Sequence, residues 1–203
     1  MTTWTLVRAL LSHVFKKRWF VSYAQFGEDA ILNTIFRKKS SGFYVDVGAY
    51  HPTHYSNTYA LYRRGWHGIV IDPNSTFKPL FSILRPRDTF VAAAVGEGAA
   101  RYYEYNNPLY NSLNQDVSND RIHLARTKDI QLKPLRDIVN TPTIDLLSID
   151  AEGYDLAVLE TLDWATRPGI IVIEGDESSG YLQGKGYSLI AITGPSRIWR
   201  DAA

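Results

Sequence analysis

The chain has 203 residues, 45% of them hydrophobic, which suits one well-packed domain and is short for two. Its 22 basic and 21 acidic residues leave a formal net charge of +1, so no global field recruits nucleic acid, and we expect no nucleic-acid partner. The chain has no cysteine, which excludes disulfides, thiolate metal sites and a cysteine nucleophile. That composition is compatible with a reducing compartment, and we expect a cytoplasmic protein.

Residues 1–21 form an N-terminal arm that departs from this charge balance. From Trp4 to Phe20 every charged side chain is basic, and apolar residues recur at helical spacing. This pattern predicts an amphipathic helix that is too short in its apolar stretch to span a bilayer and lacks the marks of a secretory signal. Two roles stay open: peripheral contact with an anionic membrane, or packing on the domain or on a second copy as a homodimer. The second is the commoner use of such a helix.

Residues 22–203 are predicted to form a single domain that alternates helices and strands. In chain order, helices are predicted over residues 28–38, 56–64, 75–84 (with Ser75 as cap) and after Gly153. Strands are predicted over residues 43–47, 68–71, 89–95, 101–105 (an edge strand), 143–150 and 169–173, then a hairpin of residues 187–192 and 197–199. Residues 106–120 are rich in turn formers and are expected to be a lid, a binding loop or a disordered segment.

The stretch from residue 42 to residue 73 organises the rest of the chain. Strand, turn, helix and strand, with an acid after the second strand, make one half of a doubly wound nucleotide-binding sheet. The ligand of such a unit lies beyond the carboxyl ends of the strands. There Gly48 lets a ligand approach the backbone, and Asp72 can accept hydrogen bonds from a ribose diol.

The residues around Gly48 indicate which nucleoside is bound. A dinucleotide site needs several glycines, because the pyrophosphate rests against bare backbone. Here the bulky Tyr50 and His51 follow a single glycine, and Asp46 precedes it, where a carboxylate would repel phosphate. An amino-acid-bearing nucleoside without phosphates fits these residues, and S-adenosylmethionine is the obvious candidate.

Four acids lie at or just beyond predicted strand ends: Asp46, Asp72, Asp150 (with Glu152) and Glu174. The carboxyl ends of parallel strands share one edge of a sheet, so these acids should converge on one crevice. Five parallel strands followed by a hairpin predict an α/β, Rossmann-like class I methyltransferase fold. That fold has a mostly parallel seven-stranded sheet, helices on both faces and a C-terminal antiparallel hairpin.

Several motifs together resemble the FkbM-type methyltransferases over roughly residues 22–200. They are the segments 23–29, 42–49 (Gly-Phe-Tyr-Val-Asp-Val-Gly-Ala), 56–58, 65–73 (ending Ile-Asp-Pro), 144–155 (including Ser-Ile-Asp-Ala-Glu-Gly) and 168–174. The resemblance implies S-adenosylmethionine-dependent O-methylation, often of a sugar hydroxyl in glycan or natural-product assembly, and hence a sugar or glycan acceptor as partner. The commonest family turn has Asn-x-Gly where this chain has Tyr-His-Pro at residues 50–52.

The resemblance also assigns the residues expected to bind the cofactor. Asp46 and Gly48 match the first cofactor motif, and Asp72 matches the ribose-binding acid. Asp150 and Glu152 match the acidic motif after the fourth strand. The expected set is completed by two residues of the matched segments, Ala49 and Asn57.

Methyl transfer to an alcohol is an in-line displacement that needs a proton acceptor near the hydroxyl. His51 and His54 are candidates for this base because both follow the cofactor turn and imidazole titrates near neutrality. Each could instead cap the turn. Asp150 or Glu152 could serve as the base, or could hold the methionine ammonium and orient the acceptor.

A divalent metal held by Asp150, Glu152 and Glu174 is chemically possible, but spacing alone does not establish it, and no metal is predicted. Tyrosines near the expected lid could stack on sugar rings, although packing along an edge strand explains them more simply: Tyr102, Tyr103, Tyr105 and Tyr110. Two other functions stay open beside the methyltransferase. One is a non-catalytic nucleoside- or glycan-binding domain, and the other, a nicotinamide-dependent oxidoreductase, is disfavoured by the single glycine.

Overall fold

The structure is a computed structural model that describes residues 20–115 and 122–202. The predictions for the N-terminal arm therefore lie almost wholly outside the described residues. Within the described ranges, no helix is both long and apolar enough to cross a membrane.

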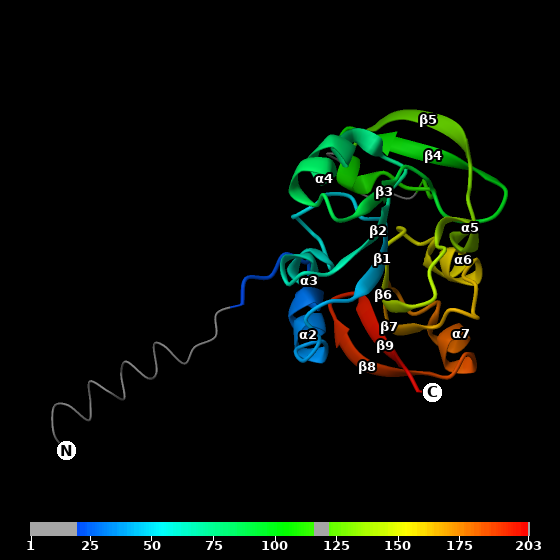
Figure 1. The fold of residues 1–203 in the computed structure, drawn as a ribbon. Coiled ribbons are helices and arrows are strands. Elements are labelled where there is room, and N and C mark those ends of the chain that lie inside the picture. Colours follow the sequence, from blue (N-terminus) through cyan, green and yellow to red (C-terminus); the bar gives the residue numbers. More distant parts are fainter. Residues whose placement is uncertain (1–19, 116–121, 203) are drawn as a thin grey trace, which may run out of the picture.

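Seven strands form the main sheet, in the order β3-β2-β1-β6-β7-β9-β8 (Figure 1). Their bounds are β1 Phe43–Val47, β2 His67–Ile71, β3 Thr89–Val91, β6 Ile144–Ile149, β7 Pro168–Glu174, β8 Tyr187–Thr193 and β9 Ser196–Asp201. The first five run parallel, and β9 lies antiparallel between β7 and β8. The predicted fold, a mostly parallel seven-stranded sheet with a C-terminal antiparallel hairpin, is confirmed.

Helices cover both faces of this sheet (Figure 1). On one side lie α2 (Glu28–Ile35), α3 (Tyr59–Arg63) and α4 (Lys78–Leu84), the last preceded by the 3-10 turn η1 (Ser75–Phe77). On the other lie α5 (Leu135–Ile138), α6 (Asp155–Glu160) and α7 (Ser179–Gly184). Successive side chains of a strand point to opposite faces, so β1 sends Tyr44 into one hydrophobic core and Val45 and Val47 into the other. Burial on both faces explains why the central strands are continuous apolar runs.

Several predicted boundaries were wrong. The helix predicted over residues 28–38 ends at Ile35, and the one predicted over residues 56–64 begins at Tyr59. The cap of the next helical segment is Asn74 instead of Ser75, because the Asn74 side chain accepts a hydrogen bond from the backbone N–H of Thr76.

The strand predicted over residues 89–95 stops at Val91. The backbone N–H of Ala93 donates to the carbonyl of Val91, 3.1 Å away, and this tight turn takes the chain out of the sheet. Three of the four remaining residues, Ala93, Ala94 and Val95, line a cavity instead of extending the strand.

The strand predicted over residues 101–105 is not an edge of the main sheet. It is β4 (Ala99–Tyr105), which pairs antiparallel with β5 (Leu124–Gln131) in a separate two-stranded sheet. This second sheet lies beyond one end of the main sheet, near β3 and α4 (Figure 1). Sequence reasoning missed β5, whose residues are mostly exposed and therefore show no apolar alternation. The segment after β4 contains a second 3-10 turn, η2 (Pro108–Tyr110).

Candidate active site

A cavity opens beyond the carboxyl ends of β1, β2 and β6, under the segment that follows β4. Its empty volume is about 680 Å³, open mouth included. The wall includes Gly48, Asp72 and Asp150, which directly follow β1, β2 and β6. It also includes Ala94 from the segment after β3 and Leu113 from the segment after β4. The neighbours of β1 in the sheet are β2 and β6, so the cavity lies where the strand order reverses, and ligands of open α/β sheets bind at this point.

Gly48 allows two strand ends to meet. Its φ is +79°, and a Cβ atom here would lie 1.8 Å from the carbonyl oxygen of Asp150. The backbone N–H of Gly48 donates to Ile71 at 2.9 Å, and that of Asp150 donates to Val47 at 3.0 Å. The sequence suggested that this glycine admits a ligand; the structure shows that it first admits the backbone of the strand end beside it.

Asp72 connects the turn that follows β1 to the turn that follows β2. One carboxylate oxygen accepts the backbone N–H of Tyr50 at 2.9 Å, and the other accepts that of Asn74 at 2.7 Å. Burial, with a smaller contribution from the charge of Asp46, raises the pKa of Asp72 to about 6 despite these hydrogen bonds. Tyr50, which also lines the cavity, has a φ of 42°, a strained conformation for a residue other than glycine.

Carboxylates converge at the ends of β6 and β7. Asp150 and Glu152 both line the cavity, and burial raises the pKa of each, helped by neighbouring acids. Glu174 lies off the lining, and burial together with Glu152, Asp155 and Glu28 raises its pKa to about 7. Added positive charge would favour the ionised form of all these groups, so the site is electrostatically suited to a cation. Across residues 20–115 and 122–202, no three His, Cys, Asp or Glu side chains are arranged to hold a metal ion.

Three of the residues predicted to bind the cofactor lie behind the cavity wall. Asp46 is buried and accepts a hydrogen bond from the Thr58 hydroxyl at 2.5 Å. Ala49 is buried and donates its backbone N–H to Ile71. The side-chain amide of Asn57 donates to the Ser148 hydroxyl at 3.1 Å. The structure thus brings Gly48, Asp72 and Asp150 together on the cavity wall. The other three, Asp46, Ala49 and Asn57, lie behind the wall and support it.

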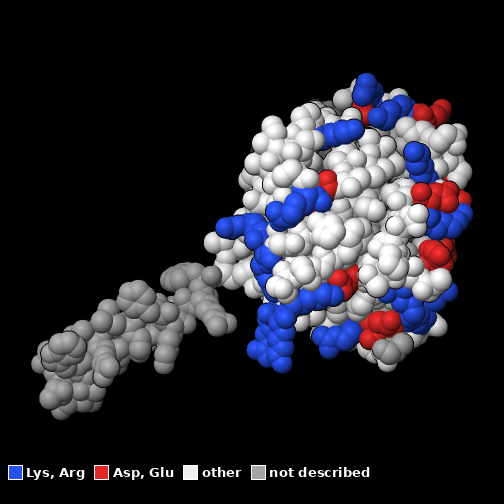
Figure 2. Space-filling view, in the orientation of Figure 1, with Lys and Arg blue, Asp and Glu red and all other residues white. Residues whose placement is uncertain are grey.

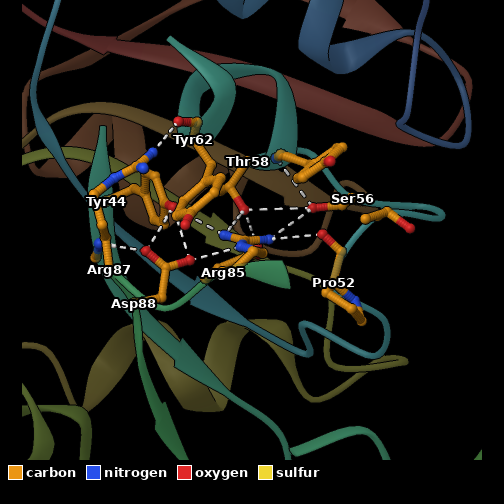
Figure 3. A network of polar contacts seen from close by, with 12 residues as sticks. Tyr44, Pro52, Ser56, Thr58, Tyr62, Arg85, Arg87 and Asp88 are labelled. Carbon is orange, nitrogen blue, oxygen red and sulfur yellow. Dashed lines mark hydrogen bonds and ion pairs between the residues drawn. The ribbon is translucent and has the colours of Figure 1, made fainter. Parts of the chain in front are cut away.

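A buried arginine that sequence reasoning missed holds the segment behind this wall (Figure 3). The Arg85 side chain is fully buried, and its Nε donates to Asp88 at 2.6 Å. Its Nη2 donates to the Tyr44 hydroxyl and the Thr58 hydroxyl, each 2.9 Å away. The signal present in the sequence is an arginine three residues before an aspartate at the end of a predicted helix, which is also the pattern of an ordinary surface pair.

The same guanidinium reaches the turn that follows β1. Its Nη1 donates to the carbonyl of Pro52 at 3.3 Å and to the Ser56 hydroxyl at 3.2 Å. Counting Thr58, three points of the segment 52–58 are fixed by one side chain (Figure 3). The Thr58 hydroxyl in turn donates to Asp46. Burial raises the pKa of Asp46, and the nearby charge of Arg85 opposes that shift.

The two histidines proposed as bases line no part of this cavity. The Nδ1 atom of His51 accepts the backbone N–H groups of Thr53 and His54, at 3.2 and 3.1 Å. It therefore carries no proton, and the neutral ring has its hydrogen on Nε2. Burial, with the neighbouring His54, lowers the pKa of His51, which favours this neutral form. The geometry fits the alternative in which His51 caps its own turn.

His54 is exposed and belongs to the same turn. Its Nδ1 lies 3.1 Å from Nδ1 of His51 and 3.2 Å from the hydroxyl of Thr53. Both imidazole rings are therefore held within the turn, and neither lines the cavity.

The segment after β4 closes the cavity from above. Asn114 donates its side-chain amide to the carbonyl of Glu152 at 2.9 Å, which links the segment to the acidic turn. The wall on this side includes Pro108, Leu109, Asn111, Ser112 and Leu113. Of the four tyrosines discussed above, only Tyr102 lines the cavity. Sequence reasoning found the segment but not its wall residues, because an irregular loop has no periodicity from which its inward side can be inferred.

The sheet order, the terminal hairpin and the cavity at the strand-order reversal define a Rossmann-like protein of the class I methyltransferase type. The family model described as "Methyltransferase FkbM domain" matches residues 46–189, and the chain belongs to this family. The family resemblance recognised in the sequence is thereby confirmed.

Among solved structures, the chain is similar to the 1,6-didemethyltoxoflavin-N1-methyltransferase of Burkholderia thailandensis, crystallised with bound 1,6-didemethyltoxoflavin and S-adenosylhomocysteine. The match has 12% identity and a TM-score of 0.50, and covers 97% of this chain and 87% of that one. A likeness at this identity supports the fold alone. No curated protein matches the chain.

Proposed function

We propose that this protein is an S-adenosylmethionine-dependent O-methyltransferase whose acceptor is a sugar hydroxyl of a glycan, a glycolipid or a glycosylated natural product. The observation that carries the proposal is the cavity at the reversal of strand order, which has Asp72 and Asp150 on its wall. Family membership supports methyl transfer. The structural neighbour, which bound S-adenosylhomocysteine, supports the choice of cofactor.

The chemistry of the wall fits this cofactor better than a nucleotide with phosphates. Asp72 supplies carboxylate oxygens for a ribose diol, and the small apolar Ala94 and Val95 leave room for a flat base. Asp150 and Glu152 suit an ammonium group, whose positive charge would offset their mutual repulsion. The same carboxylates would repel a pyrophosphate. When bound, the cofactor supplies an electrophilic methyl group.

The residues around the cavity can also manage the acceptor and its proton. A hydroxyl that attacks a methyl carbon loses its proton as the new C–O bond forms and the C–S bond breaks. Asp150 and Glu152 line the cavity, and burial raises the pKa of each, which makes either carboxylate a stronger acceptor for that proton. Carboxylates also accept hydrogen bonds from sugar hydroxyls, and Tyr102 offers an aromatic surface on the same wall. These features favour a polyhydroxylated acceptor.

Calorimetric titration of the purified full chain with S-adenosylmethionine, S-adenosylhomocysteine and NAD⁺ tests the cofactor. We expect both sulfur nucleosides to bind and NAD⁺ not to bind. Asp72→Asn should weaken the binding by at least about tenfold, because a neutral amide is a poorer partner for a diol than a carboxylate. The substitution also replaces one acceptor oxygen by an N–H donor. Asp163→Asn is the matched control, since Asp163 also caps a turn but is exposed and away from the cavity.

Two outcomes would count against the proposal. Folded protein that binds neither sulfur nucleoside would overturn the methyltransferase function and favour the non-catalytic binding domain. Protein that binds the cofactor but adds no methyl group to a panel of glycans, while methylating amines, would overturn the choice of acceptor. Mass spectrometry of the panel, read as a gain of one methylene unit, distinguishes these cases.

A further inference from the structure

Basic side chains gather at the ends of two neighbouring helices, α2 and α3. Residues 37–39 (Arg-Lys-Lys) follow the end of α2 and are exposed, and the exposed Arg63 lies at the end of α3. Arg64 joins the two ends, because its Nη2 donates to the carbonyls of Phe36 and Lys39 at 2.7 and 2.8 Å. Figure 2 shows lysine and arginine side chains over this side of the molecule, where α2 and α3 lie in Figure 1.

Most of this charge is not used within the domain. Among the residues that the structure describes, the side chains of Arg37 and Lys38 have no hydrogen-bond or ion-pair partner. Arg63 donates to the hydroxyl of Tyr23 and stays exposed. The acid that lies here, Asp145, is already paired with Lys39. The surface therefore keeps several positive charges available to a partner.

A shallow depression within this surface combines charge with an apolar floor. Lys38 and Lys39 line it together with Arg200 from β9. Its apolar lining comes from Ile35, Phe36 and Ile170. Asp145 also lines the depression and pairs with Lys39, so Lys38 and Arg200 leave the rim with a net positive charge. A positively charged rim beside an apolar floor suits an amphiphile that has an anionic head and a hydrocarbon tail.

The chain leads into the domain at this same surface. Tyr23 packs edge-on against Tyr59 of α3, with ring centroids 4.8 Å apart, and its carbonyl accepts the backbone N–H of Ser56. Just before it, Phe20 and Val21 are 41% and 65% exposed. In the sequence, Lys-Lys-Arg occupies positions 16–18, and no acidic residue precedes Glu28. In the sequence, a basic segment therefore precedes the exposed Phe20 and Val21, which lead into the described basic surface.

We propose that this basic face, made of residues 37–39, Arg63 and Arg200 with Phe20 and Val21, binds the headgroups of an anionic lipid membrane. Positive charge complements the anionic headgroups, and exposed apolar side chains at the same place can enter the boundary between headgroups and acyl chains. A nucleic acid is a poorer fit, because apolar side chains accompany these cations and the chain as a whole is nearly neutral. The inference is independent of the proposed methyltransferase function.

Sedimentation of the full chain with lipid vesicles tests it. We expect binding to vesicles of equal phosphatidylcholine and phosphatidylglycerol, and little binding to phosphatidylcholine alone. Binding should be lost as the salt concentration rises from about 50 to about 500 mM, a range that brackets physiological ionic strength. The double variant Arg37→Gln with Lys38→Gln should lower the partition coefficient about 30-fold, because each basic residue near an anionic surface contributes roughly fivefold. Both side chains are exposed, so the variant should fold normally.

The matched control removes the same charge elsewhere. Arg101→Gln with Lys133→Gln changes two exposed basic residues in and next to the second sheet, and should leave vesicle binding unchanged. Equal loss in both double variants would show that only net charge matters and would overturn a defined face. Equal binding to neutral vesicles, stronger binding to a mixed-sequence DNA duplex, or a dimer that the first variant dissociates without lipid would each overturn the membrane assignment.

Discussion

Replacing Thr58 by valine tests whether the Arg85 network shapes the active site. The side chain keeps its outline but loses the hydroxyl that accepts from Arg85 and donates to Asp46. Both partners are buried, and neither can turn to water. The change therefore cuts the connection between the buried arginine and the segment that follows β1, with little change of shape.

The expected loss of stability is about 3 kcal/mol. Hydrogen bonds to charged groups contribute about 1.5–3 kcal/mol each, and the lower end applies because Arg85 keeps its other partners. A separate effect on binding comes from Tyr50 and Tyr55, whose φ values of 42° and 54° are strained and need support from their surroundings. If loosening leaves about a tenth of the molecules with this segment in its binding conformation, the cofactor affinity falls about tenfold.

Three measurements separate these effects. Denaturant unfolding gives the stability, calorimetry with S-adenosylhomocysteine gives the affinity, and hydrogen exchange read on residues 49–58 gives the local order. Thr161→Val is the matched control, because Thr161 is also buried and its hydroxyl both donates, to Val158, and accepts, from Leu135. The control should lose about 2 kcal/mol of stability and keep its affinity.

Hydrogen exchange over residues 49–58 that rose no more in Thr58→Val than in the control would refute a role of the Arg85 network in ordering this segment. A fall in affinity shared equally by both variants would mean that global stability, and not the network, governs binding. Absence of binding in the unmutated protein would instead count against the proposed cofactor and leave the structural role of Arg85 to be judged by exchange alone.

Two further predictions use single side chains. Gly48→Ala should destabilise the protein by at least about 2 kcal/mol more than Gly98→Ala in denaturant unfolding. Both glycines have a positive φ, but only at Gly48 would a Cβ collide with a backbone oxygen. Equal losses of stability would show that the clash relaxes easily. Because the pKa of Glu174 is raised to about 7, the folded state binds the proton of this carboxyl more tightly than the unfolded state does. The protonated carboxyl therefore contributes fully to the free energy of unfolding below about pH 4, and this contribution is lost as the pH rises to about 7. Glu174→Gln should therefore flatten the decline of stability between about pH 5 and 7, more than the exposed Glu160→Gln does, and an unchanged decline would contradict the burial of that charge.

The central sheet could be predicted because its signals are local and agree with one another. The strands β1, β2, β6 and β7 are short apolar runs bounded by glycine, proline or an acid. Because these strands are buried on both faces, no choice has to be made about which face of the strand points to the core. The second sheet lacks such a signal. Most of β5 is exposed, and its strand conformation depends on pairing with β4, which comes about two dozen residues earlier in the chain. Long-range pairing of this kind leaves no pattern in either segment alone.

Position relative to the strand end decides which predicted acids reach the cavity. Asp72 and Asp150 each stand one residue beyond the last residue of β2 and β6, and Gly48 has the same relation to β1; all three line the wall. Asp46 lies one residue before the end of β1, so the pleat turns its side chain toward Thr58, and Glu174 is still the last residue of β7. A residue inside a strand has its direction fixed by the pleat, whereas the first residue after it is released toward the crevice. A one-residue difference in where a strand stops therefore separates an acid that can touch a ligand from one that supports the wall.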